Sequence, residues 1–106
     1  MNTSGYSLDG LRVLVCDDSW QIRSLINSFL NGFGVKSVEE AGDADESFER
    51  MVEFDPDLVI TDWNMPPTDG LDFVKKVRNS SESPNPYVPI IMLTGYTELY
   101  RVKQAR

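Results

Sequence analysis

Three short apolar runs, each followed at once by acidic or hydroxyl residues, constrain the fold of this chain more than any other feature of its sequence. The runs and the residues that follow them are 11–16 with Asp17 and Asp18, 58–61 with Asp62, and 90–93 with Thr94. Short apolar runs that end in polar residues are typical of buried parallel strands. Ligands of an open α/β sheet bind beyond the carboxyl ends of its strands. If the three runs are neighbouring strands, three carboxylates and a hydroxyl therefore lie in one cleft.

The apolar runs alternate with segments of helical periodicity. We expect strands at 11–16, 35–39, 57–62 and 88–94, and helices between Ser19 and Asn31 and at 44–54, 71–78 and 97–106. In the first helix, one buried face is predicted by the spacing of Ile22, Leu25, Ile26, Phe29 and Leu30. The alternation predicts one α/β domain with a parallel sheet, helices on both faces and right-handed crossovers. Residues 1–9 read as a polar tail and residues 10–106 as the domain.

The composition excludes several classes of function. The net charge of −7 argues against nucleic acids and anionic membranes as direct partners. No apolar run could span a bilayer, and the N-terminus lacks the features of a signal peptide. The single Cys16, inside a predicted strand, cannot form a disulfide within the chain and agrees with a reducing cytoplasm. Because the chain has no histidine, His-based relays and His metal ligands are excluded.

Gathering Asp17, Asp18 and Asp62 in one cleft is unfavourable unless protons or a cation relieve the repulsion. Two carboxylates about 4 Å apart repel by roughly 4 kcal/mol at an effective dielectric of about 20. Oxygen ligands without His or Cys favour Mg²⁺ or Mn²⁺ over zinc or copper, and Mg²⁺ keeps positions open for phosphate oxygens. Taken singly, Asp17 and Asp18 could cap a helix, Asp62 could start a turn, and Thr94 could be an ordinary strand-end hydroxyl. Together, however, these four residues fall at the same edge of the predicted sheet, which favours a site for a metal ion and a phosphoryl group.

Several motifs in the chain resemble those of the receiver domains of bacterial two-component response regulators. They are residues 15–19, 55–66, Asp69 with Gly70, and 89–95, and they run in the family's order over nearly the whole chain. The resemblance implies a flavodoxin-like fold, a three-layer α/β structure with a doubly wound parallel sheet. It also implies the strand order 2-1-3-4 for the four expected strands. Such a domain is a phospho-acceptor in a phosphorelay and not a conventional enzyme, with at most weak self-dephosphorylation.

The resemblance also implies a role for each residue of the predicted site. Asp62 accepts the phosphoryl group as an acyl phosphate, and the donor is a phosphohistidine on a sensor histidine kinase or a phosphotransfer protein. Asp18 and Asp62 ligate Mg²⁺ (or Mn²⁺) directly, joined by the backbone carbonyl of Asn64, whereas Asp17 binds mainly through water. Thr94 senses the phosphoryl group and draws the following loop inward, so that the surface beyond it switches for a downstream protein.

The sequence departs from the family pattern near its C-terminus. Receivers continue with a fifth strand, an active-site lysine and a fifth helix, and none of these is found before Arg106. Lys103 falls in the predicted last helix and is a poor substitute for that lysine. We therefore expect a receiver that is incomplete at its C-terminus and whose phosphotransfer is weak. Without a fifth strand beside it, the strand at 88–94 would be an edge strand with unpaired backbone groups. Such an edge favours dimerisation or segment exchange through that strand and the helix after it.

Two alternatives to a phospho-acceptor remain open. The first is a phosphorylation-independent interaction module, or an inactive receiver fragment, in which the acidic site is inherited but unused. The second is a Mg²⁺-dependent phosphatase with an aspartyl nucleophile. Such enzymes carry a second acid two residues after the nucleophile, and Asn64 cannot protonate a leaving group. The phosphatase is therefore the weaker alternative.

Overall fold

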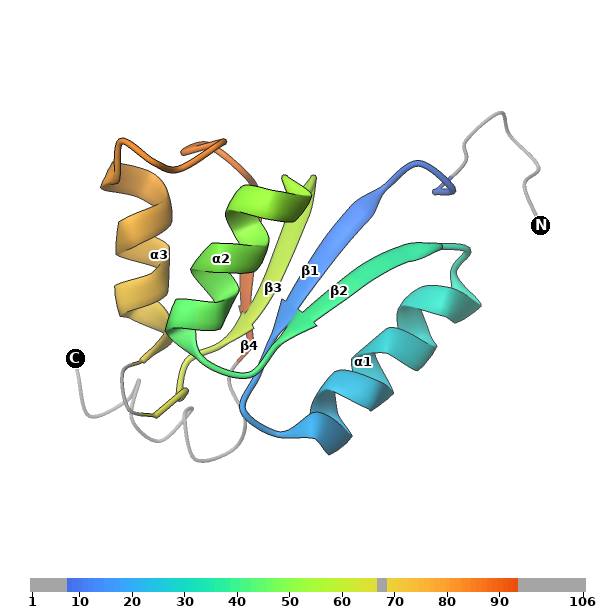
Figure 1. Ribbon diagram of the computed structural model, residues 1–106. Helices are drawn as coiled ribbons and strands as arrows, with labels where there is room; N and C mark the ends of the chain where they lie inside the picture. The colour runs from blue at the N-terminus through green and yellow to red at the C-terminus, as the bar shows by residue number, and fades with distance from the viewer. Residues whose placement is uncertain (1–7, 67–68, 94–106) are drawn as a thin grey trace.

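The chain folds into a parallel sheet with helices on both faces (Figure 1). The computed structural model describes residues 8–66 and 69–93. The strands are β1 (Arg12–Cys16), β2 (Ser37–Ala41), β3 (Leu58–Asp62) and β4 (Ile90–Leu93). The helices are α1 (Trp20–Gly32), α2 (Ala44–Phe54) and α3 (Gly70–Asn79). Helix α1 lies on one face of the sheet, and α2 and α3 lie on the other (Figure 1).

The strands lie in the order β2-β1-β3-β4, and every pair is parallel. Val15 of β1 pairs with Glu40 of β2 and Ile60 of β3, and Ile60 in turn pairs with Ile91 of β4. This is the α/β class that the sequence predicted and the order 2-1-3-4 that the family resemblance implied. In this flavodoxin-like arrangement the chain order reverses between β1 and β3, which is where such sheets bind their ligands.

Some of the predicted segments lie outside the described residues. They are most of the polar tail at 1–9, the predicted helix at 97–106, and Thr94 at the end of the last predicted strand. The expectation that a fifth strand and a fifth helix are missing stays a prediction, because it concerns residues after Leu93.

Two strands begin two residues later than the sequence predicted, whereas the other two agree to within one residue. The prediction of a strand at 35–39 was wrong by two residues, because the chain is still leaving α1 there. Gly34 has a φ of 97°, and the amide of Val35 donates to the carbonyl of Leu30 at 2.9 Å. Val35 is instead buried in the core before β2 begins. The last strand also starts two residues late, at Ile90.

Each helix begins after a residue whose side chain caps it. The caps Ser19, Asp43 and Asp69 each accept a hydrogen bond from the backbone N–H three residues further on. Helix α2 ends at Asp55, which has a left-handed conformation with a φ of 47°, and Pro56 follows it. The capping residues therefore set where the helices begin. Helices α1 and α3 accordingly begin shortly after the ends of β1 and β3.

We call the face under α2 and α3 the closed face. Its buried core consists of Leu14, Cys16, Ala41, Ala44, Phe48, Met51, Val59, Met65, Phe73, Val77 and Val88. Arg78 of α3 ties the segment before β4 to this layer, because its Nη1 donates to the carbonyls of Pro86 at 2.8 Å and Val88 at 2.7 Å. The closed face is thus a continuous core between the sheet and two helices.

We call the face under α1 the open face, because α1 is the one described helix on it (Figure 1). Its buried core is smaller and consists of Val13, Val15, Val35 and Ile60, with Ile26 and Leu30 of α1 packed against it. The prediction that α1 buries its whole apolar stripe was wrong. Ile22, Leu25 and Phe29 are 40%, 54% and 60% exposed.

The orientation of α1 explains this exposure. Arg23 and Asn27 of α1 both bond to Glu40 on the edge strand β2. On the helical wheel these two residues lie on the flank opposite Leu25 and Phe29. The helix therefore turns its polar flank toward β2 and leaves part of its apolar stripe beyond the area that the sheet covers.

Candidate metal centre

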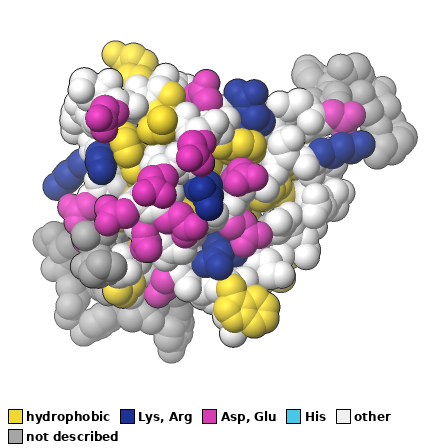
Figure 2. All heavy atoms as spheres, in the orientation of Figure 1, with side chains coloured by type: hydrophobic (Ala, Val, Ile, Leu, Met, Phe, Trp, Pro, Cys, Tyr) yellow, Lys and Arg dark blue, Asp and Glu magenta, His cyan; other side chains and the backbone are white. Residues whose placement is uncertain are grey.

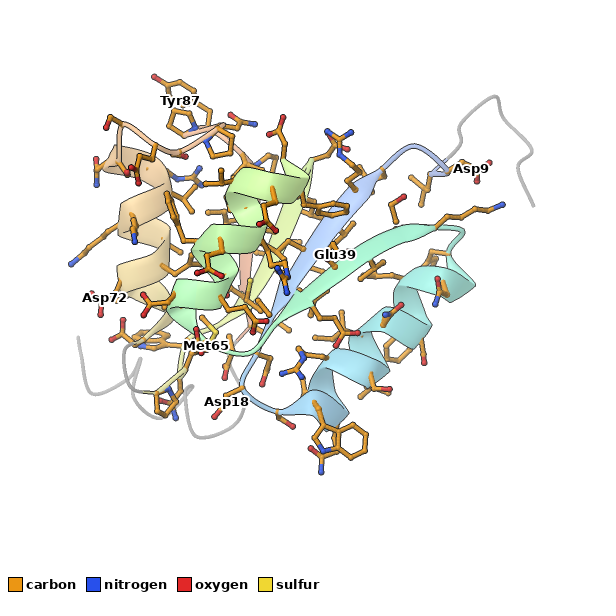
Figure 3. The ribbon with its side chains drawn as sticks, viewed as in Figure 1. Asp9, Asp18, Glu39, Met65, Asp72 and Tyr87 are labelled. Atoms are coloured by element: carbon orange, nitrogen blue, oxygen red, sulfur yellow. The ribbon has the colours of Figure 1, made fainter. Side chains whose placement is uncertain are left out.

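Three carboxylates meet at the carboxyl ends of β1 and β3. Asp17 and Asp18 follow β1, Asp62 is the last residue of β3, and one oxygen of each lies within 4.8 Å of the others. They meet because β1 and β3 are adjacent and parallel, with Cys16 paired to Thr61 just before the acids. The prediction that these three side chains come together is confirmed. Figure 3 labels Asp18 at this end of the sheet.

The three carboxylates differ in their access to water. Asp17 is buried, with 6% of its surface exposed, Asp62 is half-buried, and Asp18 is exposed. The centre is therefore closed behind Asp17 and open on the side of Asp18.

Asp17 is held by its own backbone and by the start of α1. Its amide extends the ladder to β2 by donating to the carbonyl of Ala41 at 3.0 Å, and its Oδ1 accepts from the amide of Ser19 at 2.9 Å. Burial raises the pKa of the Asp17 carboxyl, and the hydrogen bond from Ser19 opposes this rise. The neighbouring charge of Asp18 raises the pKa further, and Arg23 lowers it. The carboxylate of Asp17 is thus under electrostatic stress that a cation would relieve.

Asp62 is held in place by a close approach of α3. The amide of Gly70 donates to the carbonyl of Trp63 at 2.6 Å. A Cβ atom at position 70 would overlap the carbonyl oxygen of Asp62 and approach Trp63. The absence of a side chain at Gly70 therefore lets the first turn of α3 press against the end of β3. Glycine is the residue that permits such an approach of two backbones.

The loop between β3 and α3 is anchored on the closed face. Met65 is fully buried in that core, and Asp69 caps α3 by accepting from the amide of Asp72 at 3.1 Å. Figure 3 labels Met65 within this connection and Asp72 in the first turn of α3. Asn64, between the buried Met65 and the end of β3, is exposed. The predicted role of the Asn64 carbonyl is not tested by these contacts, and Thr94 lies outside the described residues.

Two residues that shape the centre were not assigned any role from the sequence. Gly70 was part of a motif, but a glycine before a helical pattern does not reveal which backbone it will touch. Arg23 carried no prediction, yet its Nη1 donates to the backbone carbonyl of Asp17 at 2.6 Å. Only the packing of α1 beside β2 brings that guanidinium to the end of β1.

Cys16 immediately precedes the acidic residues but faces the closed core. It is free and buried, and burial raises the pKa of its thiol to about 12. The prediction that Cys16 lies in a strand is confirmed, and the raised pKa means that Cys16 offers no thiolate to a ligand at neutral pH.

The donor atoms fit a hard divalent cation. The centre presents three carboxylates, the chain has no histidine, and the one cysteine is a buried thiol. Such an oxygen set suits Mg²⁺ or Mn²⁺, which take one to a few protein carboxylates and leave positions for water or phosphate oxygens. A cation there would also offset the repulsion among the three acids.

Comparison with known proteins decides the family. The model of the response regulator receiver domain matches residues 13–106. The chain belongs to this family. Chemotaxis protein CheY1 of Helicobacter pylori is 42% identical over 85 residues, a match that covers 79% of this chain and 67% of that protein. This receiver domain is thus CheY-like, part of two-component signalling, and its class is a signalling domain.

Solved structures agree with this assignment. Chemotaxis response regulator CheY4 of Vibrio cholerae superimposes with a TM-score of 0.74 at 35% identity, covering 89% of this chain and 76% of that one. The response regulator domain of Thermotoga maritima CheB gives a TM-score of 0.70 at 30% identity, covering 83% and 63%. Among the described residues of this receiver, no helix is long and apolar enough to cross a membrane.

Proposed function

We propose that this receiver takes a phosphoryl group onto Asp62 from a phosphohistidine of a sensor histidine kinase or a phosphotransfer protein, with Mg²⁺ bound at the acidic centre. The observation that supports this most strongly is the meeting of three carboxylates from two strands within 4.8 Å, at the end of the sheet where chain order reverses. The single buried Cys16 agrees with a cytoplasmic setting.

Four groups of the chain would hold the cation. Asp18 and Asp62 would bind it directly, the backbone carbonyl of Asn64 would supply a third oxygen, and Asp17 would act mainly through a water. When bound, Mg²⁺ supplies positive charge that stabilises the transferring phosphoryl group. The burial of Asp17 and the exposure of Asp18 agree with one carboxylate that backs the centre and one that faces the incoming donor.

The chemical step needs no general base. An oxygen of the Asp62 carboxylate attacks phosphorus while the P–N bond to the donor imidazole breaks, and the imidazole leaves with that electron pair and takes up a proton. The product is an acyl phosphate on Asp62. The contact of Gly70 with the Asp62 backbone would hold the acceptor in place during this step, because it limits movement of the end of β3 toward α3.

Two further proposals follow from the same role. Thr94 would bond the phosphoryl oxygens and shift the loop after β4 between two conformations, which would switch the surface that a downstream protein reads. The edge of β4 together with the segment after it would also support dimerisation or segment exchange, because Ile91 and Leu93 of β4 are exposed. This edge is the region through which both the switch and the self-association would act.

The test is phosphorylation by a small phosphoramidate, which carries the same P–N bond as phosphohistidine, in the presence of Mg²⁺. We expect the intact mass to rise by one phosphoryl group, and we expect Asp62→Asn to abolish the gain. Asp18→Asn should slow it strongly because one metal ligand is lost, whereas Asp45→Asn, at an exposed acid of α2, should leave it unchanged.

Two outcomes would contradict the proposal. The first is a wild-type protein that gains no phosphoryl group and shows no amide shifts near Asp62 with Mg²⁺ and beryllofluoride, which would favour a phosphorylation-independent module. The second is an equal gain in Asp62→Asn, which would move the acceptor to another residue. Release of free phosphate over many turnovers from an aryl phosphate would instead support the phosphatase.

A further inference from the structure

Arg23, at the end of the first turn of α1, joins the acidic centre to the edge strand β2. Its Nη1 donates to the backbone carbonyl of Asp17 at 2.6 Å, and its Nε donates to Oε1 of Glu40 at 3.0 Å. The other carboxylate oxygen of Glu40 accepts from Nδ2 of Asn27 at 3.0 Å. The Arg23 side chain is only 19% exposed. The guanidinium is therefore held from two sides and has little freedom to leave the end of β1.

The space for this guanidinium is provided by the loop between β2 and α2. A Cβ atom at Gly42 would come to 3.4 Å from Nη1 of Arg23 and 3.7 Å from Oε1 of Glu46. The amide of Gly42 donates to that same Glu46 oxygen at 2.8 Å, which fixes the loop beside the arginine. Arg23 thus fills a fitted site between the end of β1, the strand β2 and the start of α2.

The bond that Arg23 makes goes to the carbonyl of Asp17. It fixes the peptide between Asp17 and Asp18 and leaves the carboxylate oxygens of both residues to other partners. The orientation of that peptide decides whether the two adjacent side chains can point toward Asp62 together. Groups that orient metal ligands in this way typically change metal affinity by about 10- to 100-fold when they are lost.

Charge alone predicts the opposite effect. A guanidinium beside a cation site repels the cation, and Glu40 offsets only part of that repulsion. If Arg23 acted by charge, its removal would tighten Mg²⁺ binding. If it acts by position, its removal would weaken binding. The sign of the change therefore separates the two roles.

We propose that Arg23, anchored by Glu40, is a positioning residue of the metal centre that holds the peptide between Asp17 and Asp18 in the orientation needed to bind Mg²⁺. This inference rests on the proposed Mg²⁺ site. It assigns part of the metal affinity of the centre to a contact between α1 and β2 that touches neither the cation nor the phosphoryl group.

The experiment measures the dissociation constant for Mg²⁺ by amide chemical shifts at constant ionic strength, with far-UV circular dichroism as a check on the fold. We expect Arg23→Gln to weaken binding about tenfold although it removes a positive charge. Arg23→Lys keeps the charge but loses the planar fork, so it should also weaken binding. Glu40→Gln should weaken binding too, and the double variant Arg23→Gln with Glu40→Gln should cost less than the sum of the two.

Arg50→Gln is the matched control. Figure 2 shows a field of acidic side chains on the face of the molecule that carries α2. Arg50 of α2 pairs with Glu39, Glu46 and Glu53. Arg50→Gln removes the same charge as Arg23→Gln, again from a partly buried arginine that pairs with a glutamate of β2. The hydrogen bonds and ion pairs of Arg50 go to glutamates and not to the described acids of the centre. We expect its effect on Mg²⁺ affinity to stay within about twofold, as for a distant screened charge.

The possible results separate the inference from the proposed function. If wild-type protein binds Mg²⁺ and Arg23→Gln binds it equally well or more tightly while remaining folded, the inference is overturned and the metal site stands. A loss in Arg50→Gln as large as that in Arg23→Gln would also overturn it. If the wild-type protein shows no shifts with Mg²⁺ at Asp17, Asp18 or Asp62, the proposed metal site itself fails.

Discussion

The two faces of the sheet differ in how completely helices cover them, although apolar strand residues line both. On the closed face, eleven buried residues form one core with α2 and α3. On the open face, among residues 8–66 and 69–93, the buried core has only four residues, and α1 leaves Leu25 and Phe29 exposed. Because the free energy gained by folding scales with the apolar area removed from water, the closed face should carry most of the stability. Strand composition alone does not reveal this difference.

The acidic centre draws on both faces. Gly70 starts α3 on the closed face and holds the end of β3, whereas Arg23 reaches the end of β1 from α1 on the open face. The support of Asp62 is thus packed into a large core, and the support of Asp17 depends on a helix that buries little. We expect substitutions on the closed face to act on folding, and substitutions around α1 to act on the centre or on association.

The largest effect is expected at Gly70, where a side chain would overlap the backbone of Asp62. Gly70→Ala should lower the free energy of unfolding by about 5 kcal/mol or more, above the ordinary range of overpacking, because the overlap is with backbone and not with a side chain that can move away. Gly32→Ala in α1 is the control, since a Cβ atom there has nothing within 4 Å, and it should be neutral or slightly stabilising. Urea unfolding followed by circular dichroism measures both, and equal effects would contradict the contrast between the faces.

The next effect compares two phenylalanines on opposite faces. Phe73 of α3 is buried in the closed core, and Phe29 of α1 is exposed on the open face. Phe73→Ala should cost about 3–5 kcal/mol of stability because it leaves a cavity. Phe29→Ala should change stability by no more than about 0.5 kcal/mol, as is usual at the surface. A loss at Phe29 close to that at Phe73 would show that the open face is covered in solution.

A smaller effect concerns Asp17, whose pKa in the folded protein is raised chiefly by burial. A carboxyl with a raised folded pKa favours folding most when it is protonated, so its contribution is lost as the pH rises from the ordinary aspartate value through the folded pKa. Asp17→Asn should therefore raise the melting temperature at pH 7 without divalent metal. Below the ordinary aspartate pKa the difference should disappear.

Metal and a neutral control sharpen this prediction. Adding Mg²⁺ should stabilise the wild-type protein more than Asp17→Asn, because ligand binding to the folded state raises its stability. Glu49→Gln, at an exposed carboxyl of α2, should leave the melting temperature nearly unchanged at every pH. If Asp17→Asn lowers the melting temperature at pH 7 without metal, its charge is favourable in the fold and the inferred stress is absent.

Much of the fold could be predicted from the sequence because its signals are local. Runs such as 58–62 and the cap at Ser19 depend on neighbouring residues, the alternation of elements indicates a parallel sheet, and the strand order follows from a family resemblance. The meeting of Asp17 and Asp62 could be predicted because the ends of parallel strands share one edge.

What could not be predicted depends on contacts between distant segments. The apolar spacing of α1 gave no measure of how much of its stripe the sheet would cover, and Leu25 proved exposed. The start of β2 was placed two residues too early because Gly34, in a left-handed conformation, and Val35 still form the turn that follows α1. The roles of Gly70 and Arg23 arise from the approach of one backbone or side chain to another, and neither leaves a periodic signal.

The smallest effect on stability, and the sharpest on association, is expected at the edge strand. Ile91 of β4 pairs with Ile60 and is about half exposed on the open face, so the edge and the apolar surface of α1 offer one region for self-association. Ile91→Lys places a charge on that edge and should weaken any dimer at least about tenfold, with little change in unfolding. Tyr87→Lys is the control, because Tyr87 is exposed but precedes the sheet edge. Sedimentation velocity over a range of concentrations measures both variants.

If the wild-type protein stays monomeric at every concentration, self-association through β4 is refuted. An equal loss in Tyr87→Lys would mean that association depends on exposed apolar surface in general and not on the open face.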